Sequence, residues 1–164
     1  MLFRSLFCTN SQMVGVMYLN KNVPYDPLKD FTPIATTIMP VEVLVVKTSL
    51  PFKTVRDLVD FAKQNPGKLS YGSAGVGSVF HLNGEQLNMI AGIQTLHVPY
   101  KSPILAAQDV VAGQVDMAFT SYGGIQGLAA GGKLRILGNM EKERYKRLPD
   151  VPTIAESIPG YEKV

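Results

Sequence analysis

Residues 68–92 read KLSYGSAGVGSVFHLNGEQLNMIAG, and this stretch predicts a short apolar strand, a glycine-rich loop and a helix. The loop residues Gly75 and Gly77 allow sharp turns and a close approach of the backbone to a ligand. Ser73 and Ser78 add hydroxyl groups beside the free N–H groups at the start of the helix. Because a helix N-terminus favours negative charge, the stretch is typical of a carboxylate or phosphate site, or simply of a tight connection in an α/β sheet.

The composition is that of a globular protein with one core, since 46% of the 164 residues are hydrophobic and 18% are charged. The net charge of +3 is mild and the basic residues are spread along the chain, so no nucleic-acid partner is expected. One cysteine and two histidines exclude an internal disulfide and leave no set of ligands at zinc spacing. We therefore expect no metal and no cofactor.

No apolar run reaches the roughly 20 residues that span a bilayer, so the sequence predicts a soluble or peripheral chain. The opening MLFRSLFC is too short in its apolar part for a signal peptide, and Phe7 is too large for a cleavage site. We expect no signal peptide in this chain.

The first part of the chain predicts strands separated by proline-rich turns. Residues 2–8 indicate a strand, 12–20 two helical turns, and 31–39 and 43–47 two further strands that are rich in β-branched residues. The second of these last two strands is expected to be fully buried.

From Leu50 onward the chain alternates regularly between helix and strand. Helix crossovers of this length imply parallel strands that are covered on both faces, so the expected architecture is α/β with a doubly wound, mostly parallel sheet. The expected strands are 69–71, 95–99, 115–119 and 134–138, and the helices begin near Thr54, Ser78, Ser102-Pro103 and Thr120-Ser121.

In such sheets a ligand lies beyond the carboxyl ends of the strands. The loops after Tyr71, Val98 and Phe119 should therefore meet at one edge. Hydroxyl groups, N–H groups and one ammonium group converge there without a carboxylate pair or a nucleophile–base pair, which predicts anion recognition and no catalytic residues. The residues expected at this edge are Ser73, Gly75, Gly77, Ser78, Tyr100, Lys101, Thr120 and Ser121.

Several motifs together resemble the substrate-binding proteins of tripartite tricarboxylate transporters, the Bug-type periplasmic receptors. They are PYDPLKDFTPI (24–34), SLPFKTVRDLVDFAKQNPGKLSYGSAGVGSVFHLNGE (49–85), HVPYK (97–101), GQVDMAF (113–119) and LPDVPTIAESIPGYE (148–162). The resemblance covers nearly the whole chain, in the family's motif order. It implies a non-enzymatic protein with a fold like that of type II periplasmic binding proteins, whose two lobes close on a small carboxylate and pass it to membrane permease subunits.

The resemblance also implies a periplasmic location. The ligand-binding residues that we predict are Ser73, Ala74, Gly75, Gly77, Ser78, Tyr100, Thr120 and Ser121, with the hydroxyl of Tyr100 expected to contact ligand or a bridging water. Ser102-Pro103 and Thr120-Ser121 depart from the residues usual in the family at these places.

Family members are about twice as long as this chain, which implies an incomplete first lobe. On this interpretation residues 1–44 are a remnant of the first lobe and residues 45–138 form the ligand-binding lobe. Residues 139–164 are a truncated crossover that leads back toward the first lobe. We expect residues 1–42 to be loosely packed or covered by a second copy of the chain, so self-association is one expected partnership. A remnant without function is the alternative.

Two other classes of protein compete on the glycine-rich loop. A dinucleotide-binding domain would need G-x-G-x-x-G, whereas the order here is G-x-x-G-x-G, and no acidic residue ends the next strand. A hydrolase would use Ser73 or Ser78, but there is no G-x-S-x-G, and neither His81 nor His97 has an evident orienting acid in the sequence.

Overall fold

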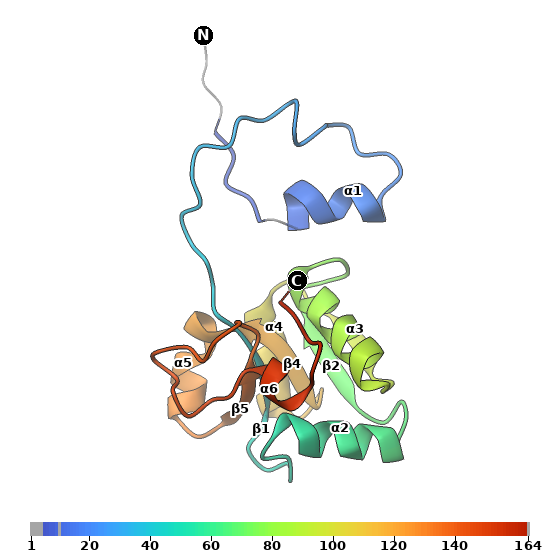
Figure 1. Cartoon of the computed structure of the whole chain (residues 1–164), viewed down its shortest axis with the longest axis vertical. Coiled ribbons are helices and arrows are strands. Elements are labelled where there is room, and N and C mark those ends of the chain that lie inside the picture. The colour runs from blue at the N-terminus through green and yellow to red at the C-terminus, as the bar shows by residue number, and fades with distance from the viewer. Residues whose placement is uncertain (1–4, 10, 164) are drawn as a thin grey trace. The chain divides into compact units, whose positions relative to one another are not determined.

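The computed structural model describes residues 5–9 and 11–163. These divide into two units, the first ending at Ile38 and the second beginning at Met39 (Figure 1). The second unit contains β1 (Glu42–Lys47), α2 (Val55–Gln64), β2 (Ser70–Ser73), α3 (Val79–Ala91), β3 (Leu96–Pro99), α4 (Pro103–Ala112), β4 (Met117–Ser121), α5 (Tyr122–Ala130), β5 (Leu134–Asn139) and α6 (Ile154–Ser157).

The second unit is built on a five-stranded sheet in the order β3-β2-β4-β1-β5. Strand β2 is parallel to β3 and β4, whereas β1 is antiparallel to both of its neighbours, β4 and β5. The expected α/β class is therefore confirmed, and the sheet is mixed, with two parallel and two antiparallel strand pairs. The reversed direction of β1 was not expected, because a buried run of apolar residues carries no information on strand direction.

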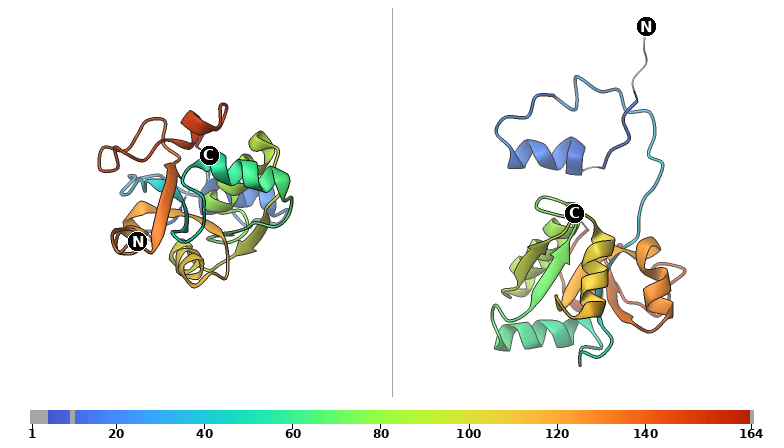
Figure 2. Two further views of the ribbon diagram at one scale, coloured as in Figure 1. Left: turned by 90° about the horizontal axis from the view of Figure 1, so that it is seen from below. Right: turned by 180° about the vertical axis from the view of Figure 1, so that it is seen from behind.

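Helices cover both faces of this sheet, as Figure 2 shows. The strand residues Leu44 and Val46 point to a core that they share with α2, α3 and α6. Their neighbours Val43 and Val45 point to a second core beneath α4 and α5. Since all four side chains are fully buried, the apolar run of β1 serves both cores at once.

Thr54 begins α2 with a reciprocal capping box. Its hydroxyl accepts a hydrogen bond from Asp57 N at 3.1 Å, and the Asp57 carboxylate accepts from Thr54 N at 3.0 Å. The pair satisfies two N–H groups that the helix start would otherwise leave without a partner.

We expect Thr54→Ala to lower the free energy of unfolding by about 1 kcal/mol, because Asp57 N loses its acceptor. Chemical denaturation measures the change. Thr37→Ala, in an exposed segment without regular structure, is the control and should leave the stability unchanged. An equal loss in both variants would contradict the role of the cap.

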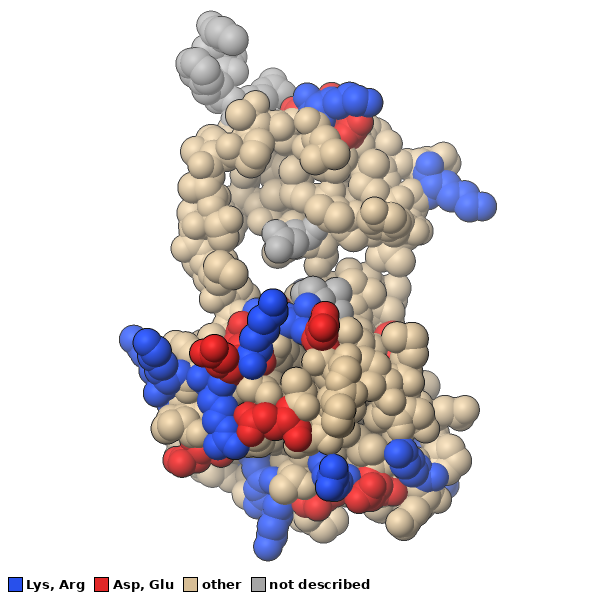
Figure 3. All heavy atoms as spheres, in the orientation of Figure 1, with Lys and Arg blue, Asp and Glu red and all other residues tan. Residues whose placement is uncertain are grey.

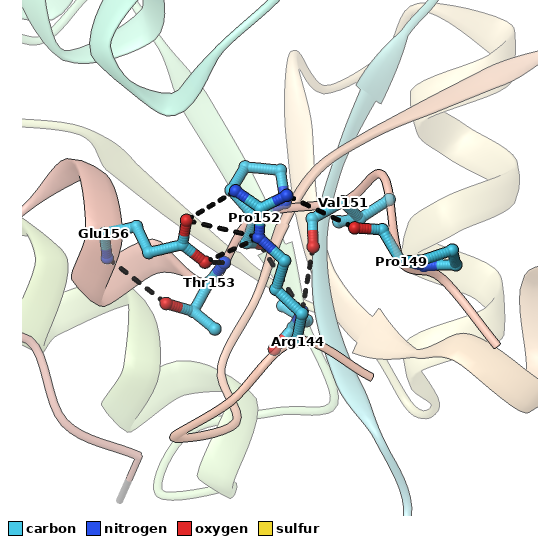
Figure 4. A network of polar contacts seen from close by, with 7 residues as sticks. Arg144, Pro149, Val151, Pro152, Thr153 and Glu156 are labelled. Carbon is cyan, nitrogen blue, oxygen red and sulfur yellow. Dashed lines mark hydrogen bonds and ion pairs between the residues drawn. The ribbon is translucent and has the colours of Figure 1, made fainter. Parts of the chain in front are cut away.

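The segment after β5 is fixed by a polar network around Arg144 (Figure 4). The guanidinium donates to both Glu156 carboxylate oxygens, with distances of 2.6 Å and 2.9 Å, and to Pro149 O at 3.3 Å. These hydrogen bonds, with those from Thr153, lower the pKa of Glu156 to about 2. Thr153 also begins α6 with its own capping box, so the network holds this segment against the end of β5.

The first unit contains a π-helical turn, Ser11–Gly15, and α1 (Val16–Leu19). Helical structure was expected here, but the strand predicted over 31–39 is wrong, because these residues have no regular structure. Pro33 and Pro40 lack the N–H that a strand donates, and the side chain of Ile34 is 90% exposed. Of the strand predicted over 2–8, residues 5–8 are not a strand and the others lie outside the described residues.

Lys and Arg side chains are interspersed with Asp and Glu on the visible face of the second unit (Figure 3). No helix among residues 5–9 and 11–163 is long and apolar enough to cross a membrane. We still predict that residues 1–42 are loosely packed or are covered by a second copy of the chain. The bounds expected for the lobes also stay a prediction.

Candidate functional site

Polar side chains gather at the edge of the sheet where β2, β4 and β5 end and β1 begins. Ser73 ends β2, Thr120 lies near the end of β4, and Asn139 ends β5, all fully buried. Glu42, the first residue of β1, pairs with Ser121 in the sheet. Buried polar groups are costly unless they are hydrogen-bonded, and the side chains of Ser73, Thr120 and Asn139 all have partners.

The glycine-rich loop crosses this edge between Ser73 and Ser78. Gly75 and Gly77 have φ angles of 102° and 77°, which side-chain-bearing residues rarely adopt. Ser78 begins α3, accepting from His81 N at 3.2 Å and donating its hydroxyl to Gly75 O at 2.7 Å. The sequence thus folds locally into a closed turn that leads directly into the helix.

Most N–H groups of this loop have partners inside it. Gly75 N donates to the Ser73 hydroxyl at 3.2 Å, and Gly77 N donates to His81 Nδ1 at 3.2 Å. Ser78 N donates to Gly75 O at 3.2 Å. In the described part of the chain, Val76 N has no hydrogen bond. Of the amides of residues 75–78, which we expect to hold an anion, Val76 N is therefore the one without a partner inside the loop.

Tyr100 lies beside the loop but directs its hydroxyl elsewhere. Its backbone N donates to Ser73 O at 3.0 Å, which places it next to the end of β2. Its hydroxyl donates to the Asp109 carboxylate of α4 at 2.8 Å, and burial, followed by Asp109, raises the pKa of Tyr100 to about 12. The hydroxyl thus donates to α4, and its expected contact with ligand or a bridging water stays a prediction. Its neighbour Lys101 is exposed.

Thr120 and Ser121 lie at the end of β4 itself, not in a loop after it as the sequence predicted. The Thr120 hydroxyl donates to Pro103 O at 3.2 Å and is buried, so it ties β4 to the start of α4. Ser121 precedes α5 without a side-chain capping bond. Its hydroxyl is thus the one in the predicted set for which the described residues supply no partner.

The half-buried Ala74 packs against the core beneath α2 and α3 and brings no polar side chain to the site. The side chains of Ser73, Ser78, Tyr100 and Thr120 thus serve mainly as supports for the loop and for the start and first turns of α4. Val76 N and the Ser121 hydroxyl have no hydrogen-bond partner among the described residues, so both remain available as donors to an anion.

Sequence reasoning missed the part that the two histidines play here. His81 and His97 stack with ring centroids 4.1 Å apart, and His97 Nε2 lies 2.7 Å from the Ser73 hydroxyl. Burial first, and then the charge of His81, lower the pKa of His97. The sequence did offer one signal for this pair: His81 lies in the first turn after the loop, and His97 lies on the neighbouring strand β3.

The Ser73–His97 bond has the distance of a nucleophile–base pair, but the surroundings do not suit catalysis. Ser73 is completely buried, and no carboxylate among the described residues bonds to His97 to orient it. The described residues also include no group of three or more His, Cys, Asp or Glu side chains placed to hold a metal ion.

Known proteins resemble this chain along nearly its whole length. A sequence profile described as the tripartite tricarboxylate transporter family receptor matches residues 6–164. A UPF0065 protein from the tcbD–tcbE intergenic region of Pseudomonas sp. (strain P51) is 36% identical over 160 residues, which cover 96% of this chain and 48% of that protein.

Two solved structures show the same fold. Rpa4515 of R. palustris, in a structure with adipate, is 34% identical with a TM-score of 0.82, covering 87% of this chain and 48% of that one. MatC (Rpa3494) from Rhodopseudomonas palustris, with bound malate, is 27% identical with a TM-score of 0.83, covering 93% and 52%. The chain thus spans about half the length of the relatives it matches. Together these matches show that it belongs to the receptor family of the tripartite tricarboxylate transporters.

Proposed function

We propose that this chain supplies the carboxylate-binding lobe of a periplasmic receptor, which captures a small carboxylate and delivers it to the membrane subunits of a tripartite transporter. The observation that carries the proposal is the closed glycine-rich loop at the sheet edge, with Val76 N directed to no described partner. Family membership and the structures of relatives with adipate and malate support the choice of a carboxylate over a phosphate.

The chemistry of the edge favours binding over reaction. Its donors are the backbone amide of Val76 and the Ser121 hydroxyl, which suit an anion that is held and released. The hydroxyls that could act as nucleophiles are tied to backbone carbonyls or buried. We therefore infer a receptor and not an enzyme.

Amide NMR titration of the chain with malate and adipate tests this function. Val76 N–H is expected to shift most, with residues at the end of β4 following, and sodium chloride at matched ionic strength controls for general anion effects. Because one lobe supplies only part of the hydrogen bonds, we expect a dissociation constant of about 1 mM. Shifts with NAD instead, or hydrolysis of a simple ester, would favour the competing classes.

Gly75→Ala should weaken carboxylate binding about tenfold, because alanine at a φ of 102° distorts the loop. Gly67→Ala is the matched control, since Gly67 has a φ of 73° and open space around it, away from the loop. It carries comparable backbone strain and should bind like wild type. Equal affinity in both variants would place the site elsewhere.

A further inference from the structure

The two imidazole rings form a short stack between the glycine-rich loop and the sheet. His81 lies on the first turn of α3, and His97 of β3 pairs with Tyr71 of β2. The His97 ring lies 4.1 Å from that of His81 and 4.8 Å from that of Tyr71, measured between centroids. The stack therefore joins the loop, the helix and two strands.

Each imidazole holds one glycine of the loop. His81 Nδ1 accepts directly from Gly77 N at 3.2 Å. His97 Nε2 bonds to the Ser73 hydroxyl at 2.7 Å, and that hydroxyl accepts from Gly75 N at 3.2 Å. Both residues with left-handed backbone in this loop are thus anchored through the histidine pair.

The two hydrogen bonds respond differently to a proton. Gly77 N needs a lone pair on His81 Nδ1, and a protonated imidazole has none, because both of its nitrogens are donors. If His97 Nε2 carries a proton, the Ser73 hydroxyl can accept a hydrogen bond from this N–H group and turn its own hydrogen to Gly75 O, which lies 3.2 Å away. Protonation of His81 Nδ1 therefore breaks the hydrogen bond from Gly77 N, whereas the Ser73 hydroxyl can adapt to a proton on His97 Nε2.

The titratable groups around the pair come from three elements. Glu85 of α3 accepts from the Tyr71 hydroxyl at 2.6 Å, so the carboxylate lies at the far side of the Tyr71 ring. Burial and the nearby His81 lower the pKa of His97, while Glu85 opposes this effect. On balance the folded chain favours a neutral His97.

We propose that His81 and His97 are positioning residues of the glycine-rich loop, which hold Gly75 and Gly77 in place only while His81 Nδ1 is unprotonated. The loop conformation is then set by pH as well as by sequence. The consequence for carboxylate capture rests on the proposed function, but the conformation can be measured on the chain with no carboxylate added.

A pH titration by NMR from about pH 8 to pH 5, which brackets imidazole titration, tests the proposal. The chain has two histidines, so both sets of ring signals can be followed individually. The protection of Gly77 N–H against hydrogen exchange is expected to fall about fivefold as the pH is lowered, which is the change for one lost hydrogen bond. The midpoint of this fall should coincide with the midpoint of the ring signals of a histidine. Gly67 N, which donates to the carbonyl of Gln94 at 2.9 Å, is the internal control and should not change with that midpoint.

His81→Asn separates positioning from packing. The asparagine carbonyl can take the place of Nδ1 as acceptor and does not titrate, so Gly77 protection should stay high across the whole range. A flat wild-type profile would overturn the proposal, as would an equal fall in His81→Asn. The wild-type profile decides the question even if the variant does not fold. Because no ligand is present, a negative titration with malate would leave this result intact.

Discussion

Gly84→Ala is expected to lower the free energy of unfolding by about 3 kcal/mol, the upper part of the range for overpacking a core. Gly84 faces Tyr71 from the middle of α3, and a Cβ there would lie 2.3 Å from Tyr71 Cε2 and 2.6 Å from Cζ. The ring cannot move aside, because it is fully buried against Phe119 and its hydroxyl is bonded to Glu85. The helix must therefore shift away from the sheet.

Denaturant unfolding followed by circular dichroism measures this loss. Gly127→Ala in α5 is the matched control, because a Cβ there meets nothing within 4 Å. Alanine is the better helix former by about 1 kcal/mol, so the control should be slightly more stable than wild type. If Gly84→Ala were as stable as the control, the close packing of α3 on Tyr71 would be wrong.

Gly84 illustrates what periodicity in the sequence can and cannot predict. The apolar spacing and Ser78 predicted α3, and the structure confirms this helix from Val79 to Ala91. A glycine in mid-helix looks like a weakness in the sequence. Its reason is a tertiary contact with a ring on β2, which no local pattern encodes.

The same limit applies to the site. The order of strands and loops predicted that Ser73, Ser78 and Tyr100 belong to one edge, and these residues do lie at the end of β2 and beside it. The partners of each polar group were not predictable, because Asp109 reaches Tyr100 only when α4 packs on the sheet. The identity of the ligand-binding groups therefore stays a prediction.

The error at residues 31–39 has a related cause. Their β-branched composition favours a strand, but a strand also needs a neighbour to accept its backbone hydrogen bonds. The segment contains Pro33, and the side chains of Ile34 and Ile38 are 90% and 69% exposed. The composition of residues 31–39 therefore favours a strand, but it cannot show whether a neighbouring strand is present to pair with them.

Glu42→Gln is expected to stabilise the chain at neutral pH by about 1–2 kcal/mol, because it removes a buried charge and keeps an oxygen to accept from Asn83. Glu42 is 4% exposed and accepts from Asn83 Nδ2 at 2.6 Å. Burial raises the pKa of Glu42, Glu141 adds to this effect, and Lys163 and Asn83 oppose it.

The pH dependence follows from the direction of that shift. A folded chain whose Glu42 pKa is raised binds the proton more tightly than the unfolded chain does, so this contribution to stability is complete below the ordinary value of 4.5 and is lost as pH rises through the raised pKa. The Glu42→Gln variant lacks this loss. Unfolding free energies of wild type and variant should therefore converge at about pH 4 and diverge at pH 7.

Glu143→Gln, at an exposed position, is the control and should follow wild type at both pH values. If Glu42→Gln were instead less stable than wild type at pH 7, the attraction of Lys163 would outweigh the cost of burial. Agreement would mean that the edge where β1 meets Ser121 carries a carboxyl group whose charge the fold does not need for stability. Because burying the charge of Glu42 costs stability, we would next compare the Glu42→Gln variant with wild type in the carboxylate titrations.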